Sequence, residues 1–253
     1  MTLLSESNSE TIFYLDLAAV LDNLSTYRSI LPKEHKIMAM IKANAYGLGA
    51  IIVANLLEKN NINYFGVAYA SEGEELRLAG IKSPIMVMNP GEMSFDKMLA
   101  QNLEPQIYSW RSLEKYISVL ADQSKFIPKG RIHIKIDTGM SRLGFKISDA
   151  DLLIKKLNQS PSMTVISLMS HLASAESPKE DSFTKKQGEI FNSFCDKIEK
   201  GLGYNCTRHI SNTSATERHP SLKGDMVRLG IGLFGYNPVI DSKLNLSPVA
   251  YLR

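Results

Sequence analysis

A chemical interpretation of this sequence starts at Lys42. It directly follows the apolar run over residues 37–41 and precedes a turn of small residues that contains Gly47 and Gly49. Such a run is typical of a buried strand, so Lys42 is expected where the strand ends and the pocket of an α/β fold opens. A lysine with restricted solvation can lose its proton near neutral pH and attack a carbonyl group, which is Schiff-base chemistry. A lysine that extends from the strand end into solvent fits the same position.

Other residues with useful chemistry stand at the ends of predicted strands, where the active sites of α/β barrels lie. One lysine and two arginines that converge on one mouth would form a site for an anionic ligand with a carbonyl group. His133, His171 and His209 are more often structural hydrogen-bonding groups than general bases in such positions. The candidate residues are Lys42, Tyr46, Lys135, Asp137, Met140, Arg142, His171, Asn212, Thr213, Arg228, Gly230 and Ile231.

The glycine-rich segment over residues 229–235 is a candidate phosphate loop. Glycines let backbone N–H groups approach phosphate oxygens, and barrels usually hold phosphate in the loops after their last two strands. A plain turn fits the pattern equally well. An acidic residue about twenty positions further on, which a dinucleotide site would need, is absent from the sequence.

The elements that must position these residues alternate between strand-like and helical segments. Eight short apolar runs, most of them separated by helical patterns, predict an α/β protein with a (β/α)8 TIM barrel. A doubly wound open sheet is the structural alternative. The expected strands cover residues 37–41, 64–68, 84–88, 105–108, 131–136, 163–169, 207–210 and 226–229. The expected helices cover residues 15–31, 51–57, 71–80, 94–101, 110–120, 149–157 and 181–200.

Several helix ends have local signals. Asp16 is a candidate N-cap, and Ser71 with Glu74 resembles a capping box. Gly201 is expected to end the long helix.

We expect a flexible N-terminus over residues 1–10, a barrel domain over residues 11–240, and the start of a further β domain over residues 241–253. This last segment is expected to hold one strand, beginning at Pro248, with no other element to pair with.

Composition excludes several classes of function. The chain of 253 residues carries a net charge of +3, and its basic residues are scattered, so we expect no nucleic-acid partner. Its apolar runs are too short to predict a membrane span, and Cys195 and Cys206 do not have the spacing of a metal site. Residues 1–10 lack the layout of a signal peptide, so we expect a cytoplasmic protein without metal.

Two segments resemble signatures of alanine racemases, which are fold-type III pyridoxal-phosphate enzymes. The segment over residues 41–47 resembles their cofactor attachment segment, and the segment over residues 134–145 resembles their second signature. The segments over residues 170–173, 209–213 and 227–236 match further signatures in the family order. The resemblance implies a barrel that binds pyridoxal 5'-phosphate.

The resemblance also implies roles at the reacting end of the site. Lys42 would form the internal aldimine and act as the acid/base on one face of the substrate carbon. Arg142 would lie near the phenolic oxygen of the cofactor and the carboxylate of the substrate, with Met140 close to the substrate. Lys135 matches a position that is carbamylated in some members of the family.

The remaining roles concern the rest of the cofactor. Arg228 would face the pyridine nitrogen with His209 beneath it as support, and His171 would pack near the ring. The residues implied at the phosphate end are Tyr46, Asn212, Thr213, Gly230 and Ile231.

This sequence also departs from the family pattern. Leu48 replaces a histidine that is usual in the first signature, and Thr213 stands where serine is common. In the family, the second base is a tyrosine from a β-rich C-terminal domain, contributed across a homodimer. Residues 248–253 resemble the first strand of that domain, so we expect weak or no racemase activity from this chain alone.

The leading hypothesis is therefore a racemase that interconverts L-alanine and D-alanine, the latter for peptidoglycan. One alternative is a non-catalytic, single-barrel protein that carries pyridoxal phosphate for cofactor homeostasis. A racemase of serine or of broader specificity would carry the same signatures. A barrel enzyme that binds a phosphorylated sugar through Gly230, without a Schiff base, is a further alternative.

Overall fold

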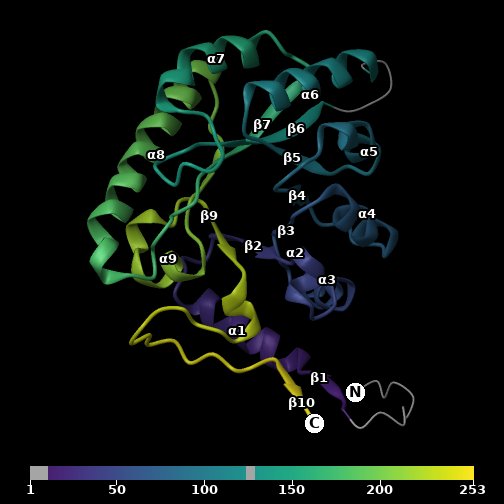
Figure 1. Ribbon diagram of the computed structural model, residues 1–253, viewed down its shortest axis with the longest axis vertical. Coiled ribbons are helices and arrows are strands. Elements are labelled where there is room, and N and C mark those ends of the chain that lie inside the picture. Colours follow the sequence, from purple (N-terminus) through teal and green to yellow (C-terminus); the bar gives the residue numbers. More distant parts are fainter. Residues whose placement is uncertain (1–10, 124–128) are drawn as a thin grey trace.

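The computed structural model describes residues 11–123 and 129–253, so the expected flexible N-terminus over residues 1–10 lies outside the described part. Its centre is a parallel sheet of eight strands in the order β8-β7-β6-β5-β4-β3-β2-β9 (Figure 1). The strands are β2 (Lys36–Met40), β3 (Tyr64–Val67), β4 (Ile85–Val87), β5 (Glu104–Ile107), β6 (Gly130–Lys135), β7 (Met163–Met169), β8 (Thr207–His209) and β9 (Met226–Leu229).

The two end strands of this sheet come together and nearly close it. The N–H group of Arg228 donates to the carbonyl of Ser211 at 3.0 Å, and the N–H group of Asp225 donates to the carbonyl of Arg208 at 2.8 Å. The expected (β/α)8 barrel is confirmed, and the open doubly wound sheet is excluded.

Helices follow the strands and form the outer layer of the barrel (Figure 1). They are α1 (Leu17–Ser29), α2 (Lys42–Tyr46), α3 (Ala50–Lys59), α4 (Ala70–Leu78), α5 (Phe95–Ala100), α6 (Trp110–Gln123), α7 (Ala150–Asn158), α8 (Asp181–Leu202) and α9 (Thr213–Arg218). Short 3-10 turns are η1 (Glu92–Ser94), η2 (Ile147–Asp149), η3 (Pro178–Glu180), η4 (Pro220–Leu222) and η5 (Ile231–Phe234). Within the described residues, no helix is both long and apolar enough to cross a membrane.

Local signals predicted some helix ends and missed others. The carboxylate of Asp16 accepts from the N–H groups of Ala18 and Ala19 at 2.9 and 3.0 Å, so the N-cap of α1 is confirmed. The expected end of α8 at Gly201 is wrong, because the helix ends at Gly203, whose φ is +78°. A Cβ at residue 201 would lie 2.6 Å from the side chain of Ile154, so this glycine allows close packing between α7 and α8.

The barrel has an outer and an inner core because successive strand residues point to opposite faces. On β6, Ile132 and Ile134 belong to the outer core between strands and helices. His133 and Lys135, on the alternate positions, are also buried. A second apolar cluster, separate from the outer core, consists mainly of methionines. Its members are Met38, Met40, Tyr64, Met86, Met169 and Met226.

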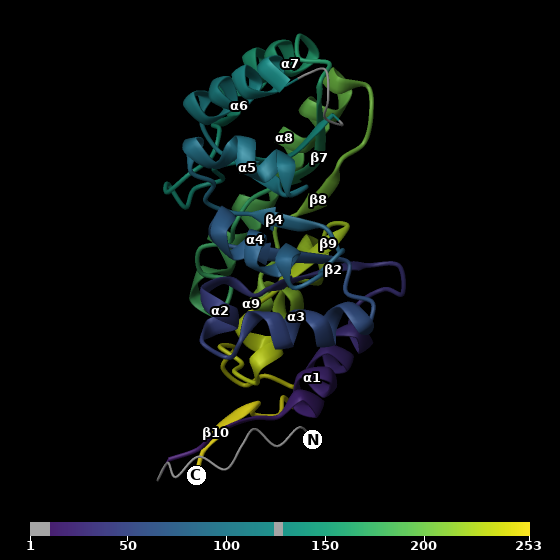
Figure 2. The same cartoon turned by 90° about the vertical axis from the view of Figure 1, so that its right-hand side faces the viewer.

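The last strand of the chain has a partner, contrary to expectation. The strand β10 (Ala250–Leu252) pairs antiparallel with β1 (Phe13–Leu15). The rings of Tyr14 and Tyr251 stack across this pair with centroids 5.1 Å apart. Figures 1 and 2 place the two-stranded sheet beside α1, outside the barrel. Three residues are too few to show a periodic pattern, which explains why the sequence did not predict β1.

Asn23 of α1 ties the glycine-rich turn to the final segment of the chain. Its side-chain amide donates to the carbonyls of Leu233 at 3.2 Å and Ser247 at 2.9 Å. Its side-chain oxygen accepts from the N–H group of Ser247 at 2.7 Å. Asn23 is buried, so water cannot replace these bonds without a rearrangement of the packing.

We predict that Asn23→Ala lowers the free energy of unfolding by about 2–3 kcal/mol, because it leaves buried backbone groups without partners. Urea denaturation followed by circular dichroism measures this change. Asn55→Ala is the matched control, because among the described residues Asn55 bonds to Ile51 within its own helix α3, and it is partly exposed. Equal effects of the two substitutions would contradict the role assigned to Asn23.

Candidate functional site

Lys42 lies two residues beyond β2 and opens a left-handed turn. Its side chain is exposed, so the restricted solvation considered for it is absent in this structure. The next four residues, 43–46, have φ between 51° and 57°. Left-handed backbone costs about 1–2 kcal/mol per residue with a side chain, so this turn must be held by its surroundings. Inside the turn, the N–H group of Ala45 donates to the carbonyl of Ile41 at 2.8 Å.

Glu72 of α4 holds the turn from the next βα unit. One carboxylate oxygen accepts from the N–H group of Ala43 at 2.6 Å, and the other accepts from that of Ala68 at 2.5 Å. The expected capping box at Ser71 is wrong, because α4 begins at Ala70 and Glu72 is already its third residue. Sequence analysis missed this contact; the acidic residue in the first turn of α4 was the available signal.

The residues expected at a phosphate end meet beside the glycine-rich turn. A Cβ at residue 230 would lie 2.5 Å from the hydroxyl oxygen of Tyr46, so this hydroxyl group lies over Gly230. The N–H group of Gly230 donates to the hydroxyl of Thr213 at 3.2 Å. Burial raises the pKa of Tyr46, so the hydroxyl remains a donor at neutral pH. Ile231 is exposed at the start of η5.

Asn212 lies at the same place, but its side chain caps a helix. Its side-chain oxygen accepts from the N–H group of Ala215 at 3.0 Å and so caps α9. This capping places Thr213, the first residue of α9, beside Gly230. Within this structure, Asn212 acts on the site through the position of Thr213.

Arg228 is buried and surrounded by neutral acceptors. Its guanidinium donates to the carbonyls of Ser170 at 2.7 Å, His209 at 3.0 Å and Ile210 at 3.1 Å. It also donates to Nδ1 of His209 at 3.0 Å and lies 3.4 Å from Nδ1 of His171. Burial lowers the pKa of Arg228 to about 10, which still leaves it charged at neutral pH.

Arg142 and Met140 lie on a loop that is fixed at both ends. The N–H group of Phe145 donates to the carbonyl of Lys135 at 2.9 Å, and that of Asp137 donates to the carbonyl of Phe145 at 3.0 Å. The Asp137 carboxylate accepts from the N–H group of Ser141 at 3.0 Å. Arg142 is exposed and Met140 is half-buried, so both can meet a ligand.

The positive charges of the site converge on His171. Burial lowers the pKa of His171, and the charges of Arg228, Lys135, Arg142 and Lys42 lower it further, to about 3. His171 is therefore neutral near pH 7. Basic side chains from the ends of β2, β6 and β9 act on one imidazole ring, as expected for a shared barrel mouth.

Lys135 is the buried lysine of this group. Its side chain lies inside the barrel, with 5% of the residue exposed. Burial lowers its pKa, as do the charges of Arg228 and Arg142, and Asp137 only partly opposes them; the resulting pKa is about 7. A large fraction of Lys135 is therefore a neutral amine under ordinary conditions.

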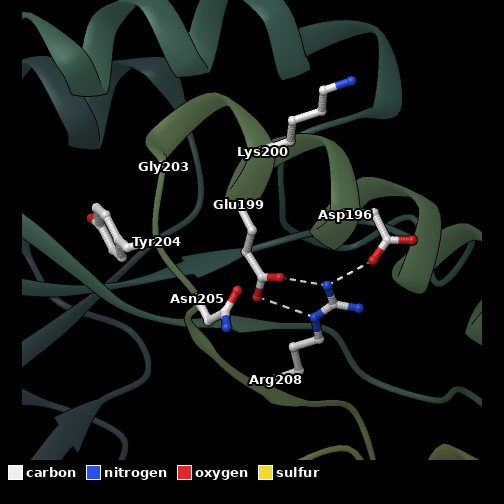
Figure 3. A pocket seen from close by; sticks show the side chains of 7 residues that line it. All are labelled: Asp196, Glu199, Lys200, Gly203, Tyr204, Asn205 and Arg208. Atoms are coloured by element: carbon white, nitrogen blue, oxygen red, sulfur yellow. Dashed lines mark hydrogen bonds and ion pairs between the residues drawn. The ribbon is translucent and has the colours of Figure 1, made fainter.

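A second hollow, on the outside of the barrel, does not share these properties. It lies between the end of α8 and the start of β8 (Figure 3) and is lined by Asp196, Glu199, Lys200, Gly203, Tyr204, Asn205 and Arg208. The guanidinium of Arg208 donates to the carboxylates of Glu199 at 2.5 Å and Asp196 at 2.7 Å. These bonds raise the pKa of Arg208 and satisfy its charge within the protein. None of the expected site residues lies in this hollow.

The residues at the barrel mouth fit a phosphorylated, carbonyl-bearing cofactor such as pyridoxal phosphate. The Arg228 guanidinium has only neutral partners among the described residues, so a ligand anion would find charge that the protein has not neutralised. Residue 230 has no room for a side chain beneath the Tyr46 hydroxyl. Lys42 is exposed on the same mouth. The donor set thus supplies an amine for a carbonyl group and hydroxyl groups for a phosphate.

Comparison with known proteins agrees with this geometry. A family model described as "Alanine racemase, N-terminal domain" matches residues 15–238. The chain belongs to the alanine racemase N-terminal domain family. The match covers both the Lys42 turn and the glycine-rich turn.

Individual alanine racemases are similar over nearly the whole chain. Those of Clostridium tetani and Methanococcus maripaludis are 36% and 34% identical to it, each over 94% of this chain. The chain spans 62% and 64% of the length of these two relatives. A solved alanine racemase from Clostridium difficile 630 aligns with 98% of this chain and 65% of its own, at a TM-score of 0.91 and 30% identity.

We predict that Lys135→Met stabilises the chain most at about pH 6 and much less at pH 10. Because the folded pKa, about 7, lies below the ordinary 10.5, both states are protonated below pH 7 and the folded chain carries the full cost of the buried charge. Between these two values only the unfolded chain keeps the proton, so the stability of the unsubstituted chain rises with pH. The expected difference at low pH is on the order of 3 kcal/mol.

Urea denaturation over this pH range, in buffer free of carbon dioxide, measures the effect. Lys59→Met is the control, because Lys59 is exposed in the last turn of α3. A benefit of Lys135→Met that does not vary with pH would argue against a buried titrating amine.

Proposed function

We propose that this chain is the cofactor-binding barrel of a racemase that interconverts L-alanine and D-alanine with pyridoxal phosphate. The main support is the geometry of the barrel mouth, where the hydroxyl groups of Tyr46 and Thr213 meet at Gly230 beside the turn that Lys42 opens. Membership of the alanine racemase N-terminal domain family supports the same reaction. Since the chain spans 62% of the length of the first relative, the activity belongs to the proposal for the complete protein.

Pyridoxal phosphate, when bound, delocalises the charge that forms when the α-carbon of an amino acid loses its proton. The amine of Lys42 would bind the cofactor and then move a proton to or from one face of that carbon. Arg228 would donate an N–H group toward the ring nitrogen. Because its pKa, about 10, is above neutral pH, it would keep its own proton and leave the ring a mild acceptor of charge.

The remaining residues would bind and orient. The hydroxyl groups of Tyr46 and Thr213 would hold the phosphate beside Gly230 and Ile231. Arg142 would orient the substrate carboxylate, and Met140 would pack close to the substrate.

Lys135 would supply the anion that these cations lack. Its neutral amine can attack carbon dioxide, releasing a proton and leaving a negatively charged carbamate between Arg142 and Arg228. We predict a carbamate carbon signal in nuclear magnetic resonance spectra of the chain supplied with isotope-labelled bicarbonate. The signal should be missing from Lys135→Met and present in Lys59→Met. An identical signal in all three proteins would place the carbamate elsewhere.

The family resemblance supports further parts of the proposal. The second base would come from the C-terminal domain of a partner subunit in a cytoplasmic homodimer, and the D-alanine would serve peptidoglycan. A preference for serine, or a broader specificity, would use the same barrel residues. The solved alanine racemase of Clostridium difficile 630 in complex with cycloserine supports a small amino-acid-like substrate.

The central test is chemical labelling of Lys42. The chain is mixed with pyridoxal phosphate, reduced with borohydride and digested. We expect a pyridoxyl group on Lys42, none at this position in Lys42→Ala, and normal labelling in Lys59→Ala. Labelling that never includes Lys42 would contradict the proposal and favour a barrel that binds phosphorylated sugars.

A second measurement separates a racemase from a cofactor carrier. In deuterated water, the chain should exchange the α-proton of one alanine enantiomer faster than it racemises either, because Lys42 serves one face. Lys42→Ala should reduce this exchange by at least about a hundredfold, as expected for loss of an acid/base group. Exchange with neither enantiomer by a Lys42-labelled chain would favour the non-catalytic carrier.

A further inference from the structure

A continuous line of buried hydrogen bonds runs from Arg228 into the barrel. Arg228 donates to Nδ1 of His209 at 3.0 Å, and Nε2 of His209 lies 2.8 Å from the hydroxyl of Ser167. That hydroxyl lies 2.6 Å from Nδ1 of His133, whose Nε2 lies 2.9 Å from the Glu104 carboxylate. All five residues are buried. The line crosses five neighbouring strands, from β9 through β8, β7 and β6 to β5.

The first bond fixes the proton on His209. A guanidinium has only N–H donors, so Nδ1 of His209 must be the acceptor. Burial and the charge of Arg228 lower the pKa of His209, which keeps its ring neutral. The single ring proton is therefore on Nε2, where it is donated to the oxygen of Ser167.

The same reasoning fixes the next two groups. Since the Ser167 oxygen accepts from His209, its own proton is free to be donated to Nδ1 of His133. His133 then carries its proton on Nε2 and donates it to Glu104. If Nδ1 of His133 were protonated as well, the Ser167 proton would have no acceptor among the contacts of the described residues. When all the hydrogen bonds run in this one direction, every donor and acceptor in the line has a partner.

The far end of the line is anchored by charge. Burial alone would raise the pKa of Glu104, but the hydrogen bond from His133, the charge that His133 carries when protonated, and the charge and hydrogen bond of Arg131 lower it to about 2. Glu104 also accepts from the hydroxyl of Tyr64 at 2.9 Å and from Arg131 at 2.5 Å. An anion at this end fixes Nε2 of His133 as a donor, because a carboxylate can only accept.

We infer that Ser167, His133 and Glu104 are positioning residues, which bind the Nε2 proton of His209, hold its ring with Nδ1 toward Arg228, and thereby hold the Arg228 guanidinium in place beside the candidate site. This inference rests on the proposed function only for the identity of the ligand that Arg228 meets. The orientation of the line is a property of the protein itself. It assigns a role to three residues that lie outside the candidate site.

Removal of the Ser167 hydroxyl tests the line at its middle. In Ser167→Ala, the Nε2 proton of His209 loses its acceptor, while Nδ1 still faces the Arg228 guanidinium and can only accept from it. The His209 ring is then held on one side alone, so the ring can turn and Arg228 can shift with it. The carbonyls of Ser170, His209 and Ile210 would still hold the guanidinium, so we expect a misplaced donor and a folded chain.

The experiment uses the chain with isotope-labelled histidine, whose ring nitrogens report the tautomer by nuclear magnetic resonance without cofactor. We expect His209 and His133 to carry their protons on Nε2 in the unsubstituted chain. In Ser167→Ala, His209 should keep its proton on Nε2 but show a shifted Nε2 resonance and faster exchange of that proton with solvent, and Ser167→Thr should restore both. The dissociation constant of pyridoxal phosphate should rise about tenfold in Ser167→Ala, as expected for one unsatisfied buried donor.

Ser160→Ala is the matched control. Its hydroxyl is also buried and donates to the carbonyl of Lys156, but it lies outside the line, so both readouts should stay unchanged. An Nδ1 proton on His209 in the unsubstituted chain would overturn the inference, as would identical behaviour of Ser167→Ala and Ser160→Ala. A chain with the expected tautomers but no label on Lys42 would refute the proposed function and leave the positioning of Arg228 in place.

Discussion

The electrostatics of this barrel mouth depend on a buried guanidinium that has no carboxylate partner among the described residues. Arg228 is held by the carbonyls of Ser170, His209 and Ile210, which orient it without cancelling its charge. Arg208, on the outside, donates to two carboxylates instead. A buried ion is expensive to leave uncompensated. The protein tolerates it at Arg228, so a bound group that accepts from this guanidinium or balances its charge would offset part of the cost.

The other groups at the mouth respond to this charge. It contributes to lowering the pKa of His171 to about 3 and that of Lys135 to about 7. Lys135 thereby loses much of the proton that it would hold in water, and His171 stays neutral even in mild acid. Like charges lie close together at this site, so the anionic cofactor proposed above would reduce their repulsion and stabilise the fold by mass action. Affinity for that cofactor and stability of the barrel would then depend on the same few side chains.

The strands could be predicted because their signals are local, and the predicted site residues stand at the ends of those strands. The apolar run before Lys42 predicts a strand, and a barrel places strand ends together. Contacts between distant segments gave weaker signals. Glu72 could be recognised as an acidic residue near a helix start, but not as the partner of the Lys42 turn, and the pairing of β1 with β10 had no signal. The predicted end of α8 at Gly201 was wrong because close helix packing and helix termination both favour glycine. The alternation of His133 and Lys135 on β6 was visible, but the direction of the hydrogen bonds depends on Ser167 and Glu104 from other strands.

The left-handed turn after Lys42 limits whether this lysine segment could be transferred to another protein. The turn is strained over residues 43–46, and part of what holds it is the Glu72 carboxylate of α4, in the next βα unit. The segment therefore does not hold this turn without contacts from elsewhere in the chain. Grafted into another barrel without a counterpart of Glu72, the same residues would relax toward ordinary backbone geometry and point the amine elsewhere. The smallest transferable unit includes two consecutive βα modules.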